Sequence, residues 1–199
     1  AAAVERLREA TGGDVHGVPL HVGDTASIPE VIEALVAEHG LIDVLVNNAA
    51  TNPYFGNLLD TPVAAWDKTF DVNVRGSFVL AQQVARRLIE AERPGSLIQL
   101  TSILGVQAAP MQGVYGMTKA ALISLTKTLA VELGPANIRA NAIAPGLVET
   151  RFASVLVETP ELRRMFEERT AFGRIAQPEH IAGAAVFLAS DESAYVTGA

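Results

Sequence analysis

The stretch Ile42-Asp43-Val44-Leu45-Val46-Asn47-Asn48-Ala49-Ala50 joins an almost continuous apolar run to two asparagines and two small residues. An apolar run of this kind is typical of a strand covered on both faces, as in a parallel sheet between helical layers. The polar and small residues follow the strand, and in open parallel sheets ligands bind beyond the carboxyl ends of the strands. The stretch therefore predicts an α/β fold with a ligand site at one edge of a parallel sheet.

Helical and strand patterns alternate along the rest of the chain, as a doubly wound parallel sheet requires. Further strands are expected over 15–22, 96–101 and 137–143. Helices are expected over 1–10, 28–39, 61–92 with a break, 114–133 and 178–189. Ser27 and Glu30 form an S-x-x-E pattern that predicts a capping box at the start of the second helix. We expect three layers, α/β/α, in a single domain over 1–199.

Composition excludes several classes of protein. Hydrophobic residues make up 49% of the chain and charged residues 19%, which excludes a disordered acidic chain. A net charge of −7 and the absence of any basic run argue against a nucleic-acid partner. The sequence has no cysteine, and its 4 histidines are far apart along it, so no metal is expected. No apolar run approaches the ~20 residues that span a membrane, and we expect a cytoplasmic protein without a membrane partner.

The step Tyr115-Gly116-Met117-Thr118-Lys119 carries the strongest chemical signal. Residues four apart lie on one face of a helix, so the Tyr115 hydroxyl and the Lys119 ammonium can converge. A neighbouring ammonium favours the phenolate, and we expect it to lower the pKa of Tyr115 toward the range of a general acid and base. Ser102, close to the end of a strand, would add a hydrogen bond to an oxygen held there. An amphipathic pair on a helix surface is the alternative for Tyr115 and Lys119 alone.

Three further segments accompany this group in a fixed order: Asn47 to Ala50, Asp71 to Val74, and Ala144 to Thr150. Together with the Ser102, Tyr115 and Lys119 pattern they resemble the short-chain dehydrogenase/reductase family, classical type, over nearly the whole chain. The resemblance implies a Rossmann-like fold and NAD(P)-dependent interconversion of a small-molecule carbonyl and an alcohol by hydride transfer. Residues 48–56 and 66–68 are similar to the dehydrogenase/reductase member 4 group of carbonyl and retinal reductases, which favours NADP over NAD.

The resemblance assigns catalytic roles to four residues. Tyr115 is the general acid and base, and Lys119 lowers its pKa and binds the nicotinamide ribose. Ser102 orients the substrate oxygen. Asn73 distorts its helix and holds a water behind Lys119.

The resemblance also implies a set of cofactor contacts. Asn48, Ala49 and Ala50 lie beside the adenosine ribose, with Ala50 where the family usually has glycine. His21 and Val22 replace the family's Asp-Val pair near the adenine, although an exposed histidine of no special role fits equally well. The remaining contacts lie at the nicotinamide: Tyr115, Lys119, Pro145, Gly146, Val148 and Thr150.

Residues 151–174 mix apolar and charged side chains without a clear strand. The family has a substrate lid here, and a surface helical hairpin would have the same pattern. Family resemblance further implies a homodimer or homotetramer. Leu122, Leu125 and Leu129 form an apolar stripe on the catalytic helix that belongs either to the core, the default, or to such an interface.

No G-x-x-x-G-x-G run precedes the first strand, although the family binds the pyrophosphate with such a turn. We therefore expect an internal piece of a longer enzyme, without the first two strands and the last strand of the family's sheet. Segment 15–22 would then have no strand partner and 42–46 would lie at a sheet edge, so we expect a marginally stable or aggregation-prone chain.

Two alternative functions remain open. A catalytically silent dinucleotide-binding or scaffolding protein fits the missing Gly-rich turn. A sugar-nucleotide epimerase or dehydratase also uses Y-x-x-x-K, but the compact Pro145-Gly146 segment argues against it. The Tyr115 to Lys119 spacing disfavours enoyl reductases, which separate the two residues further.

Overall fold

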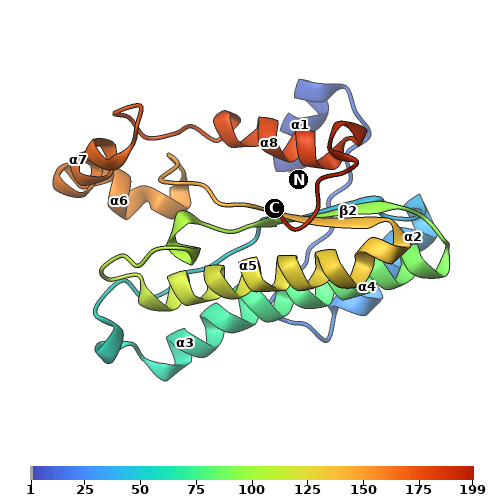
Figure 1. The fold of residues 1–199 in the computed structure, drawn as a ribbon, viewed down its shortest axis with the longest axis horizontal. Helices are drawn as coiled ribbons and strands as arrows, with labels where there is room; N and C mark the ends of the chain where they lie inside the picture. Colours follow the sequence, from blue (N-terminus) through green and yellow to red (C-terminus); the bar gives the residue numbers. More distant parts are fainter. Residues whose placement is uncertain (1) are drawn as a thin grey trace.

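The computed structural model describes residues 2–199, and its centre is a three-stranded parallel sheet between two layers of helices (Figure 1). The strands are β1 (Val44–Asn47), β2 (Gly95–Leu100) and β3 (Ile138–Ile143), in the order β1-β2-β3. In the middle strand Leu97 pairs with Leu45 on one side and with Ala140 on the other. The predicted α/β class is confirmed, and each predicted strand from 42 onward lies within two residues of its expected bounds.

One face of the sheet is covered by α4 (Ser77–Glu90) and α5 (Gly113–Leu133), which lie side by side, with α2 (Ile28–His39) packed against α4 (Figure 1). Helix α8 (Glu179–Ala189) packs on β2 and β3 from the other face. Fully buried apolar side chains fill the space between the sheet and α2, α4 and α5: Ile28, Leu88, Leu97 and Ile138. Leu122 and Leu129 are buried within this side of the molecule, so the apolar stripe of α5 belongs to the core.

The break predicted within 61–92 is a six-residue π-helical turn, Asp71–Gly76, which joins α3 (Val63–Phe70) to α4. The remaining helices are α1 (Ala2–Thr11), α6 (Ser154–Glu158) and α7 (Pro160–Arg169). Helix α2 begins and ends as predicted, but the expected capping box is wrong. Ser27 has a helical backbone and its hydroxyl donates to the Asp24 carbonyl, so it does not cap the helix.

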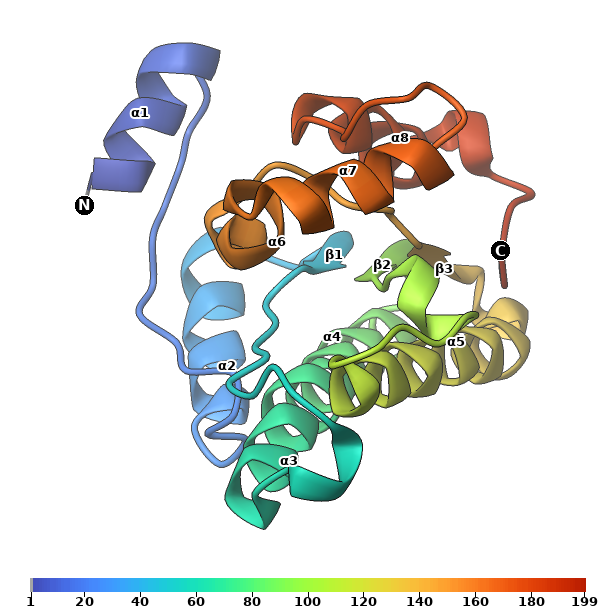
Figure 2. The same cartoon turned by 90° about the vertical axis from the view of Figure 1, so that its left-hand side faces the viewer.

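The expected strand over 15–22 is not formed. Residues 12–22 run as an extended connection between α1 and α2, well away from β1 (Figure 2). A strand needs a neighbour for its backbone N–H and C=O groups, and the described sheet offers none beside this segment. The expectation that 42–46 lies at a sheet edge is confirmed. β1 is an edge strand in which Val44 and Val46 are 38% and 44% exposed.

At the opposite edge, the end of the chain runs beside β3. The Gly198 N–H donates to the Ala140 carbonyl, and the Ala142 N–H donates to the Ala199 carbonyl. None of the helices within residues 2–199 is both long and apolar enough to cross a membrane.

Candidate active site

A cavity of about 550 Å³ lies beyond the carboxyl ends of all three strands. The segments that follow β1, β2 and β3 each contribute to its wall, and the start of α5 closes one side. Figure 2 looks onto this end of the molecule, with α6 and α7 above the strands. A ligand site at this edge is what the sequence predicts for a parallel sheet.

Ser102 lies two residues beyond the end of β2 and is buried. Its backbone is extended and its hydroxyl accepts a hydrogen bond from the Leu104 N–H at 3.1 Å, which caps the short helical turn Ile103–Gly105. Gly105 lets this turn lie directly on α5, because a Cβ there would stand 2.8 Å from the Lys119 backbone. The close contact brings Ser102 to the side of the cavity where Tyr115 lies.

Tyr115 and Lys119 occupy the first two turns of α5 and both line the cavity. Lys119 is 2% exposed, and its Nζ donates a 2.7 Å hydrogen bond to the carbonyl of Leu100 at the end of β2. The same Nζ lies 5.4 Å from the centroid of the Tyr115 ring. The Tyr115 ring also contacts Phe152, at 5.6 Å between ring centroids.

The expected lowering of the Tyr115 pKa is wrong. Burial raises the pKa of Tyr115 to about 12, and the neighbouring Ser102 hydroxyl only partly opposes the shift. Burial also lowers the pKa of Lys119 to about 8. The physical reason is that desolvation disfavours the charged form of both groups, while the Lys119 ammonium is directed at a backbone carbonyl.

Asn73 is fully buried in the π-helical turn between α3 and α4. Its Oδ1 accepts from the Thr51 N–H at 2.7 Å, and its Nδ2 donates to the Thr51 carbonyl at 3.0 Å and to the Thr118 hydroxyl at 3.1 Å. The predicted distortion of the helix at Asn73 is confirmed. The side chain fastens the segment after β1 to α5, next to Lys119.

Most of the predicted cofactor contacts come together in the cavity. The lining includes Asn48, Ala49, Ala50, Pro145, Gly146, Val148 and Thr150. His21 and Val22 are not part of the lining. His21 is exposed in the turn before α2, and the Val22 carbonyl packs against Gly76.

The segment 151–174 covers one side of the cavity with apolar side chains from α6, α7 and the turn before them. These are Phe152, Val155, Leu156 and Phe166. The base of the segment is fixed, because Thr150 accepts from the Ala153 N–H and Val148 forms a bridge to Ala176. This placement favours a lid over a detached surface hairpin.

Gln112 is a cavity residue that the sequence reasoning missed. It immediately precedes α5, is 8% exposed and shares the cavity wall with Tyr115. Its position three residues before Tyr115 could have identified it, since a residue one helical turn away shares the same face.

Comparisons with known proteins agree with this arrangement. A family profile described as enoyl-(acyl carrier protein) reductase matches residues 1–199, although the Tyr115 to Lys119 spacing disfavours that particular activity. Dehydrogenase/reductase SDR family member 4 of Pongo abelii is 38% identical over 190 residues, covering 96% of this chain and 68% of the relative.

Two solved structures have nearly the same fold. A gluconate 5-dehydrogenase from Burkholderia cenocepacia J2315, in complex with NADP and tartrate, superposes with a TM-score of 0.94 at 33% identity, over 100% of this chain and 76% of that one. An NAD+-bound xylitol dehydrogenase gives a TM-score of 0.92 at 28% identity, over 99% of this chain and 80% of that one. The Rossmann-like fold and the resemblance to the member 4 group are thereby confirmed. The chain belongs to the short-chain dehydrogenase/reductase family of NAD(P)-dependent oxidoreductases.

Proposed function

We propose that this chain interconverts a carbonyl compound and an alcohol, with Tyr115 as the general acid and base and a nicotinamide cofactor as the hydride carrier. The observation that carries the proposal is the meeting of Ser102, Tyr115 and Lys119 on the wall of one cavity at the carboxyl ends of parallel strands. Apolar side chains from residues 151–174 line the same cavity, and they suit a hydrophobic carbonyl substrate.

The residues present fit the nicotinamide and ribose part of such a cofactor. Within residues 2–199 the Lys119 ammonium donates one hydrogen bond, to Leu100, whereas an ammonium can donate three. Its remaining donors suit a ribose diol at the cavity wall. Pro145, Gly146, Val148 and Thr150 would flank the nicotinamide. The 199 residues hold no G-x-x-x-G-x-G run, so the pyrophosphate contacts that such a turn makes are outside this assignment.

The protein side chains would manage the proton and the substrate oxygen. At neutral pH the raised pKa keeps the proton on Tyr115, which suits its donation to an oxygen that gains negative charge during carbonyl reduction. Ser102 would donate a second hydrogen bond to that oxygen. The Lys119 ammonium would favour the resulting phenolate, because a nearby opposite charge stabilises the charged form. The bound cofactor would supply or accept the hydride.

Replacing Tyr115 tests the proposal. NADPH and NADH binding would be followed by fluorescence titration, and turnover by absorbance with a panel of apolar ketones and aldehydes. Tyr115→Phe should reduce turnover by at least about 10²–10³-fold, the usual cost of losing one such donor, and should leave cofactor binding within about twofold.

Tyr195→Phe is the matched control, because Tyr195 is fully exposed and is not part of the cavity lining. Its turnover should equal that of the unmodified chain. Cofactor binding without turnover in the unmodified chain would favour a silent dinucleotide-binding protein. Turnover by Tyr115→Phe near the unmodified level would overturn the role of Tyr115.

A further inference from the structure

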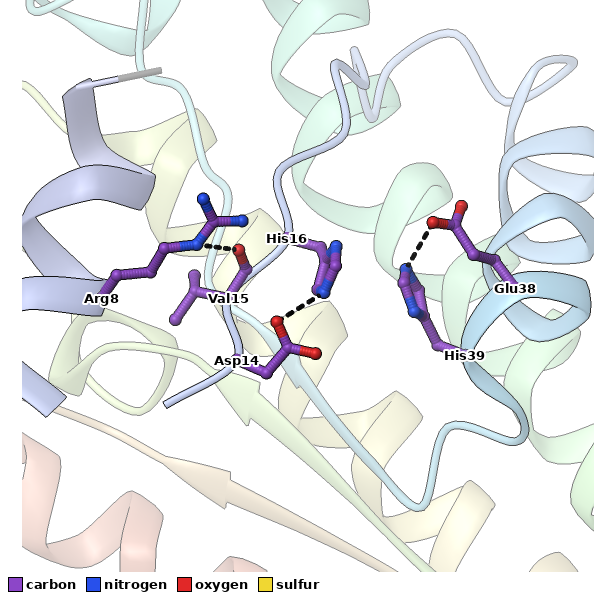
Figure 3. Close-up of polar contacts among 6 residues, drawn as sticks. All are labelled: Arg8, Asp14, Val15, His16, Glu38 and His39. Carbon is purple, nitrogen blue, oxygen red and sulfur yellow. Dashed lines mark hydrogen bonds and ion pairs between the residues drawn. The ribbon is translucent and has the colours of Figure 1, made fainter. Parts of the chain in front are cut away.

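A second cluster of polar side chains lies away from the cavity, where the extended segment 12–22 passes the end of α2 (Figure 3). His16 from this segment and His39 from the last turn of α2 face each other, with ring centroids 4.2 Å apart. Glu38 stands beside them, and its Oε1 is 3.7 Å from the His39 Nε2. His16 and His39 are far apart along the sequence, which argues against a metal site, but folding brings the two rings together.

The geometry points to a divalent transition-metal site, of the Zn²⁺ class, formed by His16, His39 and Glu38. One ligand atom from each residue lies within 4.8 Å of the others. Around tetrahedral Zn²⁺, ligand atoms about 2.0–2.2 Å from the metal are about 3.3–3.6 Å from one another. The Glu38 to His39 distance is already close to that range. Small side-chain rotations at this exposed position would move a ring nitrogen of His16 into the same range of distances.

Asp14 supports the same assignment. Its Oδ1 lies 2.8 Å from the His16 Nε2, so Asp14 can accept the ring N–H and leave the Nδ1 lone pair of His16 free for a metal. Histidines that bind metals commonly donate their second ring nitrogen to a carboxylate in this way. A water would complete the coordination by three protein ligands, as in sites with an open position.

The charges around the cluster favour a cation. The hollow is lined by Arg8 and Glu5 on α1 and by Glu38, with Asp14 next to His16. Three carboxylates and one guanidinium therefore surround the two histidines. The Arg8 Nε donates a hydrogen bond to the Val15 carbonyl at 2.9 Å. This bond ties the guanidinium to the backbone and links α1 to the extended segment.

The position of the cluster separates it from the proposed active site. Helix α2 leads into the amino end of β1, whereas the cavity lies beyond the carboxyl ends of the strands. The two hollows share no lining residue. A metal here would fasten segment 12–22, which has no strand partner within residues 2–199, to the helix that packs on the core.

Calorimetric titration of the 199-residue chain with ZnCl₂ tests the site. We expect one Zn²⁺ per chain, and His16→Ala and His39→Ala should each weaken binding at least tenfold. Asp14→Asn should weaken it about tenfold through the loss of its support for His16. His180→Ala is the matched control, because His180 is equally exposed and lies on α8, outside the cluster. All four side chains are exposed, so the variants should fold, which circular dichroism would verify.

Limited proteolysis provides an independent readout. Zn²⁺ should slow cleavage near the exposed Gly12-Gly13 in the unmodified chain and in His180→Ala, but not in His16→Ala or His39→Ala. Failure of the unmodified chain to bind Zn²⁺, or binding that is unchanged when both His16 and His39 are replaced, would overturn the site. Equal cleavage rates with and without Zn²⁺ in the unmodified chain would contradict the fastening of segment 12–22.

Discussion

Lys119 is buried with its ammonium next to a backbone carbonyl and near an aromatic ring, and no carboxylate accepts from it among the described residues. Burial without a counter-charge explains why its pKa falls to about 8. At neutral pH the buried Lys119 therefore carries its charge at a cost in folding free energy. A ligand that offers oxygen acceptors to this ammonium would relieve that cost, which ties the electrostatics of the cavity to ligand binding.

The lowered Lys119 pKa predicts how stability depends on pH. Between pH 8 and 10.5 the unfolded chain keeps a proton on Lys119 that the folded chain has released. The free energy of unfolding should therefore rise with pH across this window, by at most about 3 kcal/mol. Tyr115 acts in the opposite sense between pH 10 and about 12, because there the folded chain keeps a proton that the unfolded chain has lost.

Urea denaturation at pH 7.5 and pH 9.5 would measure the rise. Lys119→Met should flatten it, because the uncharged side chain has no proton to release. Lys127→Met should retain it, since Lys127 is exposed on the same helix. Equal pH dependence in the two variants would show that Lys119 is not the source.

At the scale of elements, the π-helical turn between α3 and α4 explains how the segment after β1 is held. The turn presents Asn73 to Thr51 and places Gly76 against the end of the extended segment. A Cβ at Gly76 would stand 2.3 Å from the Val22 carbonyl oxygen, so this contact tolerates no side chain.

Two glycine-to-alanine substitutions distinguish the effect of this contact on stability from the effect of alanine on helix propensity. Gly76→Ala should destabilise the chain by about 1–3 kcal/mol, because the backbone of segment 12–22 must move away. Gly183→Ala, within α8, should stabilise it by about 0.5–1 kcal/mol, because a Cβ there meets nothing within 4 Å. Chemical denaturation measures both. A Gly76→Ala variant as stable as the unmodified chain would show that segment 12–22 is not held at this turn.

The same elements show what local sequence can and cannot predict. The bounds of α2 and α5 could be read from the sequence, because prolines, glycines and apolar spacing act over a few positions, whereas the distortion at Asn73 followed from the family resemblance. Segment 15–22 has strand-forming residues, yet whether it pairs depends on a distant neighbour. The pKa of Tyr115 depends on the lid and on burial, and the approach of His16 to His39 depends on how α2 lies against segment 12–22. None of these is encoded locally.

At the scale of the whole molecule, the layers do not cover the sheet evenly. Leu45 of β1 faces the core beneath α4, but Val44 and Val46 on the opposite face are exposed, and the main contacts of α8 with the sheet are to β2 and β3. The outer edge of β1 therefore offers unpaired backbone groups next to exposed valines. The helical layer also has exposed apolar side chains, with Phe78 on α4 41% exposed and Val131 on α5 79% exposed.

The open edge of β1 and the exposed side chains on α4 and α5 predict two kinds of association. The second of them would be the expected homo-oligomer. Open strand edges pair without limit and lead to aggregates, whereas one helix face that meets its own copy across a two-fold axis gives a closed dimer. Val46→Lys should place a charge on the edge and lower the large aggregates seen by light scattering, while leaving any dimer intact. Val131→Lys should instead weaken the dimer and leave the aggregates unchanged. A Val46→Lys chain that aggregates as readily as the unmodified one would show that aggregation does not proceed through the β1 edge. A monomeric unmodified chain would rule out the dimer.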